Sequence, residues 1–343
     1  LLSIWRVIVH RYLAARIFPE RVILVGSDSF AKEIAEEILS RKHLGYNLLG
    51  FLDDDPSIHG VSIVNPKVLG GTEMVSALAQ GSQATKVVVA PGDHRGRLNL
   101  DALLECKTLG IPVERGADFL EKLTGRVVLD GPRVRSWLIY SQGFVISRSI
   151  LFWKRSLDVL VALVLMVLSA PVMGVAALLI RLESHGPVIF RQERVGRGGR
   201  VFTLWKFRSM RSDAEAEDGA QWATANDTRI TRIGKLIRKT RIDELPQLWN
   251  VFRGDMSLVG PRPERPEFVN QLIERSQFYE LRLAVRPGLT GWAQIRAAYA
   301  ASMEESIEKL KYDLYYIKNL SIFLDLSILA STVRIVTLGK GAR

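Results

Sequence analysis

The first third of the chain alternates short apolar runs with segments in which apolar residues recur at helical spacing. Residues 21–26, RVILVG, are a β-rich apolar run, and the segment after them has apolar positions spaced as on one face of a helix. Similar patterns predict strands within residues 46–55 and 86–93, and a helix followed by a strand within residues 100–114. Because strands that alternate with helices indicate a parallel, doubly wound sheet, we expect an α/β domain over residues 21–146.

The turn after the first apolar run indicates whether this domain binds a dinucleotide. It reads GSDSFA and keeps only the first glycine, Gly26, of the G-x-G-x-x-G pattern. Asp28, at the second glycine position, would crowd and repel a pyrophosphate. Asp53 lies at about the ribose-binding spacing, which means little without the glycines. We therefore favour a structural or regulatory Rossmann-like module over a cofactor-binding domain.

Residues 159–180 form the longest apolar segment and carry no charge. The segment is about long enough to cross a bilayer as a straight helix. Pro171, near its middle, removes a backbone donor and favours a break or a kink. Lys154, Arg155 and Arg181 flank it on both sides, which favours a helix that enters and leaves on one side because cationic residues prefer the cytoplasmic face. A full span and a buried core helix stay open as alternatives.

Two further patterns follow this segment. Residues 184–210 predict a β-hairpin whose turn holds three glycines among arginines, on a basic face. Residues 228–243 place Ile230, Ile233 and Ile237 on one face of a basic helix, which predicts either membrane-surface binding or an ordinary packed face under a charged exterior. The polar residues 211–229 between them predict a mobile loop.

The charge balance narrows the choice of partners. The 343 residues carry a formal net charge of +11, which favours an anionic partner such as phosphorylated substrates or an acidic membrane surface. No zinc spacing or aromatic stripe of a nucleic-acid-binding module is present, so we expect no nucleic acid. Cys106 is the only cysteine, and no two of the five histidines have metal-ligand spacing. Any chemistry must therefore use carboxylates, arginines and lysines.

The acidic pair Asp243 and Glu244 stands out because arginines surround it in the stretch TRIDELPQLWNVFRGDMSLVGPRPERPEF. Pro246 suits the first turn of a helix, so we expect both carboxylates at a helix N-terminus and Asp243 ionised. An ionised aspartate can attack phosphorus while arginines and Mg²⁺ offset the phosphate charge. Glycosidase chemistry is disfavoured because adjacent residues cannot flank a sugar. The plain alternative, that the pair only complements the helix dipole, stays open.

From about Trp153 to the C-terminus the chain resembles the bacterial sugar transferases that act as polyprenyl-phosphate hexose-1-phosphate transferases. The matching stretches follow the family's order: KRSLDVLVALVLMVLSAPVM, GPVIFRQERVGRGGRVFTLWKFRSM, RKTRIDELPQLWNVFRGDMSLVGPRPERPEF, RPGLTGWAQI and KLKYDLYYIKNLSIFLDLSIL. The whole chain is similar to the long form of the family, in the branch linked to exopolysaccharide synthesis.

This resemblance implies a reaction and a set of site residues. A UDP-sugar would give its sugar-1-phosphate to undecaprenyl phosphate, with release of UMP, by a ping-pong route. Asp243 would be the nucleophile and Glu244 would help to bind Mg²⁺. Arg238 and Arg262 match positions expected to contact phosphate or nucleotide. Weaker substrate-binding candidates are Lys206, Arg208, Arg265 and Arg286.

The resemblance also implies an organisation. Residues 1–20 would be a linker helix after an N-terminal membrane bundle that precedes this sequence, residues 147–183 a re-entrant membrane helix broken at Pro171, and residues 184–343 a mixed, helix-rich catalytic domain with C-terminal interfacial helices. The family often has serine before the break proline, whereas this chain has Ala170 there and Ser169 one position earlier. The catalytic domain would lie on the cytoplasmic face of the bacterial inner membrane, in contact with its lipid.

Two other functions stay open on the sequence. A membrane-anchored Rossmann-like regulator of polysaccharide export would need no chemistry at Asp243. An NAD-dependent sugar-modifying enzyme would use the N-terminal domain, against which the turn at Gly26 counts. A homodimer through the N-terminal domain is also left open.

Overall fold

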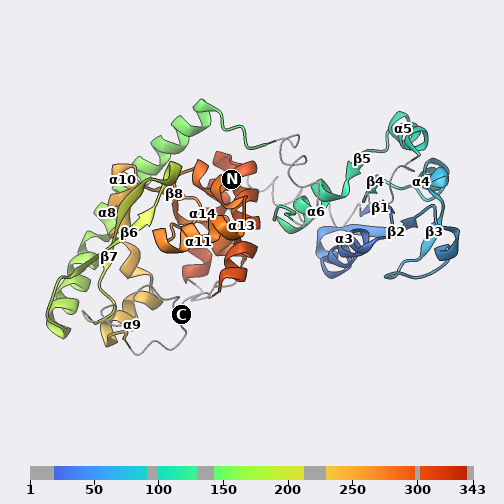
Figure 1. Cartoon of the computed structure of the whole chain (residues 1–343). Coiled ribbons are helices and arrows are strands. Elements are labelled where there is room, and N and C mark those ends of the chain that lie inside the picture. Colours follow the sequence, from blue (N-terminus) through green and yellow to red (C-terminus); the bar gives the residue numbers. More distant parts are fainter. Residues whose placement is uncertain (1–18, 91–98, 130–142, 212–228, 298–301, 338–343) are drawn as a thin grey trace. The chain divides into compact units, whose positions relative to one another are not determined.

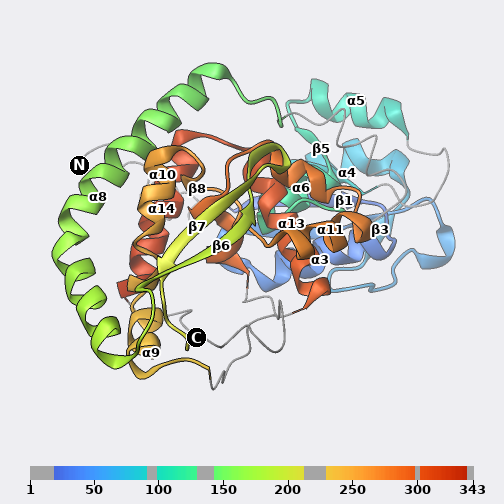
Figure 2. The same cartoon turned by 60° about the vertical axis from the view of Figure 1, so that its left-hand side comes forward.

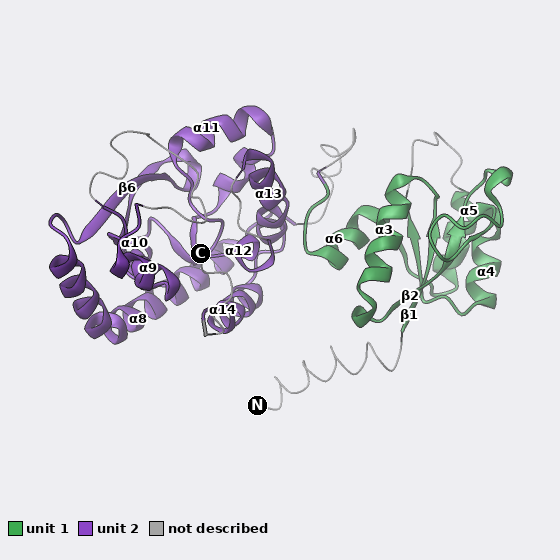
Figure 3. Ribbon diagram, turned by 90° about the horizontal axis from the view of Figure 1, so that it is seen from below, with its two compact units in different colours: residues 1–128 green, residues 129–343 purple. Residues whose placement is uncertain are grey.

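The computed structural model describes residues 19–90, 99–129, 143–211, 229–297 and 302–337 (Figure 1). The chain divides into two compact units, residues 1–128 and 129–343 (Figure 3). The boundary expected from the sequence was at residue 146. Most of the expected linker helix over residues 1–20 and most of the polar segment 211–229 lie outside the described residues, and Glu20 begins the first strand.

Unit 1 contains a five-stranded parallel sheet in the order β3-β2-β1-β4-β5, which confirms the predicted parallel arrangement. Helices α3, α4 and α5 lie between strands along the chain, and α6 follows the last strand. In chain order the elements are β1 (Glu20–Val25), α3 (Ser29–Ser40), β2 (Tyr46–Leu52), β3 (Val68–Gly70), α4 (Val75–Gly81), β4 (Lys86–Val89), α5 (Leu100–Thr108), β5 (Val113–Arg115) and α6 (Gly116–Thr124).

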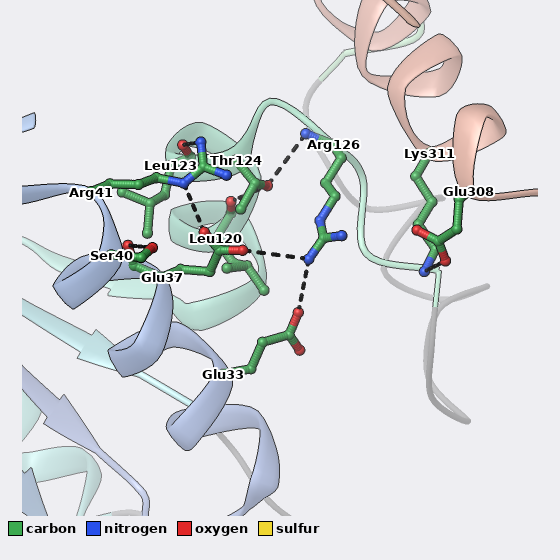
Figure 4. Close-up of polar contacts among 10 residues, drawn as sticks. All are labelled: Glu33, Glu37, Ser40, Arg41, Leu120, Leu123, Thr124, Arg126, Glu308 and Lys311. Atoms are coloured by element: carbon green, nitrogen blue, oxygen red, sulfur yellow. Dashed lines mark hydrogen bonds and ion pairs between the residues drawn. The ribbon is translucent and has the colours of Figure 1, made fainter. Parts of the chain in front are cut away.

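Both faces of this sheet are buried, which explains why its strands read as continuous apolar runs. Val22 and Leu24 of β1 belong to a core formed with α3 and α6, whereas Ile23 and Val25 belong to a core formed with α4 and α5. Arg126 follows α6 and reaches Glu33 of α3, Nη2 to Oε1, at 3.3 Å (Figure 4). The two cores show that helices cover both faces of the sheet, with α3 and α6 on one face and α4 and α5 on the other.

Unit 2 is rich in helices and begins with the long helix α8 (Arg148–Glu183). An antiparallel hairpin follows, as the sequence predicts, with its turn at Arg197–Gly199. After α8, the elements of unit 2 in chain order are β6 (Ile189–Val195), η4 (Arg197–Gly199), β7 (Val201–Phe207), α9 (Arg232–Lys239), η5 (Ile242–Glu244), α10 (Gln247–Arg253), β8 (Ser257–Val259), α11 (Pro266–Arg275), η6 (Tyr279–Ala284), β9 (Gly288–Thr290), α12 (Trp292–Arg296), α13 (Met303–Lys318) and α14 (Ile322–Thr337).

Helix α8 continues through Pro171 instead of separating into two helices at that residue. Figure 2 shows that it is curved along its length. A proline inside a helix removes one backbone hydrogen bond, and the turns on either side can keep theirs, so a bend suffices. Ser169 Oγ has no hydrogen-bond partner among the described residues. The path of α8 in a membrane stays a prediction.

Both ends of α8 are held by the same unit. Near its start, Lys154 Nζ donates to Val259 O at 2.9 Å and to Asp325 Oδ2 of α14 at 2.7 Å. Near its end, Ala176 and Ile180 pack in an apolar cluster with β7 and α9. The segment between these two anchors exposes large apolar side chains, among them Leu160, Leu163, Val164, Val167, Leu168, Val172 and Val175. Within the described residues α8 is the one helix long and apolar enough to cross a membrane, which suggests membrane association.

Candidate active site

The hairpin places Lys206 beside the acidic pair. Lys206 lies on β7, opposite Phe190 of β6, and its ammonium group is 5.0 Å from the Phe190 ring centroid. The buried Asn250 fixes β7 to α10: its Nδ2 donates to Thr203 O at 2.7 Å, and its Oδ1 accepts from Trp205 N at 3.1 Å. These two bonds set the position of the strand that carries Lys206.

A sharp turn after α9 presents the two carboxylates. Arg241 has φ of +60°, a left-handed conformation uncommon for a residue other than glycine, and it starts the 3₁₀ turn η5 that contains Asp243 and Glu244. We expected Asp243 and Glu244 at the N-terminus of the helix that begins near Pro246, and the structure does not place them in that helix. Pro246 precedes α10 as its N-cap, and the carboxylates lie in the separate 3₁₀ turn η5, which begins after the left-handed Arg241.

Asp243 is 9% exposed, and its Oδ1 has no hydrogen-bond partner among the described residues. Burial, aided by the negative charge of Glu244, raises the pKa of the Asp243 carboxyl from 3.8 to about 6. Three cations oppose this rise: Lys206, Arg238 and Arg262. Desolvation is the largest of these effects, so the pKa of Asp243 is raised although cations are near. The carboxyl is still mostly ionised at pH 7.

Glu244 has the opposite electrostatic character. Burial would raise its pKa, but the pKa is lowered because Arg262 and Arg241 stabilise the carboxylate. Arg262 Nη2 donates to Glu244 Oε1 at 2.8 Å, and Arg241 Nη1 lies 3.8 Å from the same oxygen. The neighbouring carboxylates thus differ: one is firmly ionised and paired, and the other is buried with an unpartnered oxygen.

Burial lowers the pKa of the Lys206 ammonium group to about 8, and the positive charge of Arg194 contributes in the same direction. The pKa of Lys206 is raised by Asp243, so the two groups stabilise each other's charged forms. Arg194 was not among the site residues expected from the sequence. Its place in the basic hairpin was the only available signal, because its proximity to Lys206 depends on strand register.

The predicted site residues separate into two groups. The structure brings together Lys206, Arg238, Asp243, Glu244 and Arg262. The other three have partners elsewhere. Arg208 donates to Ser184 O at 2.8 Å and to His185 O at 2.9 Å, Arg286 Nε donates to Gly254 O at 3.0 Å, and Arg265 Nε lies 3.5 Å from Glu267 Oε2. Arg208 thus holds the turn after α8.

A metal ion would find limited protein ligands here. Among the described residues no group of three or more His, Cys, Asp or Glu side chains could hold a metal. Mg²⁺ commonly uses one or two carboxylates together with substrate phosphates, so the pair Asp243 and Glu244 fits an ion that arrives with a phosphorylated substrate.

The first turn of unit 1 does not present a free anion site. Asp28 Oδ1 accepts from Ala31 N at 2.9 Å and caps α3 with its own carboxylate. Asp53 is buried, with Oδ2 bonded to Ser27 Oγ and Oδ1 accepting from Asp55 N at 3.0 Å. Asp28 and Asp53 thus bind the protein itself, which disfavours a nicotinamide cofactor.

The fold and the charges define a class of protein. It is an α/β protein with a long exposed apolar helix, and it has a buried carboxylate with cationic side chains around it. Such a cluster of cations is suited to binding phosphorylated compounds. The family model described as bacterial sugar transferase matches residues 149–339, and the chain belongs to that family.

Several curated proteins are similar to the chain. It is 46% identical over 242 residues to the UDP-N-acetylgalactosamine-undecaprenyl-phosphate N-acetylgalactosaminephosphotransferase of Aeromonas hydrophila, over 70% of this chain and 56% of that protein. It is 34% identical over 349 residues to the undecaprenyl-phosphate glucose phosphotransferase of Komagataeibacter xylinus, over 95% of this chain and 61% of that protein. A UDP-glucose:undecaprenyl-phosphate glucose-1-phosphate transferase of Caulobacter vibrioides is 41% identical over 219 residues, or 63% of this chain and 82% of that protein. The chain thus spans about three-fifths of the first two relatives.

Proposed function

We propose that this protein transfers a sugar-1-phosphate from a UDP-sugar to undecaprenyl phosphate and releases UMP. The observation that carries the proposal is the buried Asp243, whose Oδ1 is unpartnered among the described residues and which lies beside Lys206, Arg238 and Arg262. The match to the bacterial sugar transferases covers this site and supports the same conclusion.

In the first half-reaction a carboxylate oxygen of Asp243 attacks the phosphorus that carries the sugar. The bond between the two phosphates breaks, UMP leaves with the bridging oxygen, and an aspartyl phospho-sugar forms. Lys206, Arg238 and Arg262 would offset the charge that develops on the phosphate oxygens. Burial of Asp243 favours this step because a desolvated carboxylate has a raised pKa and is more basic, hence more nucleophilic.

In the second half-reaction a phosphate oxygen of undecaprenyl phosphate attacks the same phosphorus. The acyl phosphate bond breaks, Asp243 regains its carboxylate, and a diphosphate-linked sugar forms. Glu244, with substrate phosphates, would hold Mg²⁺, which supplies charge neutralisation.

The lipid acceptor requires that the site face a membrane. Helix α8 exposes a continuous apolar stretch, and residues on both sides of this stretch contact the same unit. A helix held this way favours entry and return on one face of the bilayer. We place unit 2 on the cytoplasmic face of the inner membrane, where cationic flanks are preferred and UDP-sugars are available.

The function is tested by UMP release. Protein in nanodiscs is mixed with Mg²⁺ and a panel of UDP-sugars, including UDP-glucose, UDP-galactose and UDP-N-acetylgalactosamine, with and without undecaprenyl phosphate. We expect UMP, with steady turnover only when the lipid is present. Release of UDP would mean ordinary glycosyl transfer. No nucleotide release from folded protein would favour a membrane-anchored regulator.

The pKa values predict how the rate depends on pH. Asp243 must be ionised to attack, so kcat/KM should fall about tenfold per pH unit below about 6 and level off above it. Above about pH 8, Lys206 loses its charge, so phosphate binding should weaken and KM should rise.

The variant Lys206→Arg separates these two limbs of the pH profile, measured as initial rates of UMP release. Because arginine stays charged, the alkaline limb should disappear while the acid limb stays near pH 6. An acid limb near pH 4 would contradict the raised pKa of Asp243.

A further inference from the structure

The loop that carries Arg262 is fixed at every carbonyl. Residues 261–264 include two prolines, so the loop has only two backbone N–H groups of its own. All four carbonyls nevertheless accept a hydrogen bond from outside the loop. The donors are Gly288 N to Pro261 O at 2.8 Å, Arg282 Nη2 to Arg262 O at 2.7 Å, Arg194 Nη1 to Pro263 O at 3.0 Å and Val195 N to Glu264 O at 2.9 Å.

Two of these donors are side chains, and Arg282, on η6, is the buried one of the two. Its side chain is 8% exposed, and its guanidinium has three partners in fixed directions. Nε donates to Asp313 Oδ2 of α13 at 2.7 Å, Nη1 donates to Tyr279 Oη at 2.6 Å, and Nη2 donates to the Arg262 carbonyl. A planar guanidinium held at three points transmits the position of α13 to the loop.

The same loop residue then contacts the acidic pair. Arg262 Nη2 donates to Glu244 Oε1 at 2.8 Å, and Glu244 is adjacent to Asp243. A continuous series of hydrogen bonds therefore runs from Asp313 through Arg282 and the loop to Glu244. We propose that Arg282 is a positioning residue, which holds the Arg262 carbonyl so that the Arg262 guanidinium stays against Glu244 beside Asp243.

This inference rests on the proposed function, because Arg282 acts through Arg262 and does not itself touch the carboxylates. A catalytic group displaced by about 1 Å can lose on the order of a hundredfold in rate. Prolines on both sides of Arg262 leave the loop few bonds of its own, so a side chain from η6 supplies what its backbone cannot.

The test compares kcat and KM of R282K, R262K and the double variant, each corrected for its folded fraction. Lysine keeps the charge but cannot bond both Asp313 and Arg262 in the same geometry. We expect R282K to lower kcat roughly 10- to 100-fold with KM changed less than about threefold. We expect the double variant to be within about twofold of R262K, because both changes act on one group.

Glu308→Gln is the matched control, since it neutralises an exposed carboxylate on the same helix α13, which lies 2.7 Å from Lys311 Nζ (Figure 4). Its kcat should stay within about twofold of wild type. Losses that multiply in the double variant, or an unchanged kcat in R282K, would overturn the inference. If R282K fails to fold, Asp313→Asn weakens the same anchor at constant volume and should lower kcat in the same direction.

Hydrogen exchange gives a readout that does not need activity. The amides of Val195 and Gly288 donate to the loop carbonyls of Glu264 and Pro261, and we expect both amides to exchange faster in R282K and not in Glu308→Gln. Unchanged exchange would also refute the positioning role. A wild type that releases no UMP while R282K loosens the loop would instead remove the proposed function and keep the structural link.

Discussion

Asp243→Asn is expected to abolish UMP release, with a loss of at least about a thousandfold. Asparagine keeps the shape of the side chain but is neither ionised nor nucleophilic, so the first half-reaction has no acceptor for the phosphoryl group. The measurement is the initial rate of UMP release at saturating UDP-sugar. Intact-protein mass spectrometry without lipid should show the mass of a phospho-sugar on wild type and none on the variant.

The same variant should not lose stability, which separates a chemical effect from unfolding. Because the pKa of Asp243 is raised from 3.8 to about 6, the folded state holds the proton more tightly than the unfolded chain. Its contribution to stability is present below about pH 4 and is lost as pH rises through about 6. At pH 7 the ionised carboxyl therefore destabilises the fold by roughly 2–3 kcal/mol, which asparagine removes.

Glu308→Gln is the control for this variant, because it neutralises an exposed carboxylate of the same unit that pairs with Lys311. It should release UMP at close to the wild-type rate. If Asp243→Asn kept a tenth or more of the wild-type rate, or formed the same adduct, the assignment of the nucleophile would be wrong.

Lys154→Met is expected to have the largest effect on stability, about 3–5 kcal/mol. Lys154 and Asp325 form a buried pair at 2.7 Å, with side chains 9% and 2% exposed, that links α8 to α14. Removal of the cation leaves Asp325 buried without it. Burial already raises the pKa of Asp325 while Lys154 lowers it, so the variant should take up a proton there and become less stable at high pH.

The double variant K154M/D325L tests this reason for the loss. Tyr316 Oη bonds both Asp325 Oδ1 at 2.8 Å and Val259 O at 3.1 Å, so it keeps one partner when the carboxylate is removed. We expect most of the stability to return, measured as the denaturation midpoint in one detergent. If the single and double variants lost equal stability, the loss would come from altered packing and not from the unpaired charge of Asp325.

Lys32→Met is a matched surface control. Lys32 and Glu36 lie 3.8 Å apart on α3, and both side chains are about half exposed. A pair in this position should contribute less than about 0.5 kcal/mol. A comparable loss in this variant would indicate a general effect of lysine removal.

The local pattern of the chain was sufficient for several elements. The apolar runs at 21–26 and 86–93 predicted buried parallel strands, because a strand covered on both faces carries apolar residues at every position. The hairpin was predicted from the glycines within residues 196–199, and the structure shows why glycine suits this turn, since Gly198 has a left-handed φ of +67°. The adjacent pair Asp243 and Glu244, among arginines, indicated where chemistry would be found.

The electrostatic character of the site was decided by the tertiary structure. Burial in the folded unit desolvates Asp243, while β7, α9 and the loop of residues 261–264 bring Lys206, Arg238 and Arg262 beside it, so its pKa rises although cations are near. Which cation approaches, and which instead bonds a backbone carbonyl as Arg208 and Arg286 do, depends on packing between segments.

The sequence by itself determined the elements, the acidic pair and the apolar segment, because these follow from neighbours within a few residues along the chain. Only the tertiary structure decided the continuity of α8 through Pro171, the buried Lys154–Asp325 pair, and the series of bonds from Asp313 to Glu244. The pair and the series depend on contacts between residues far apart in the chain, for which periodicity and spacing carry no signal, whereas a proline within an apolar segment allows both a break and a bend.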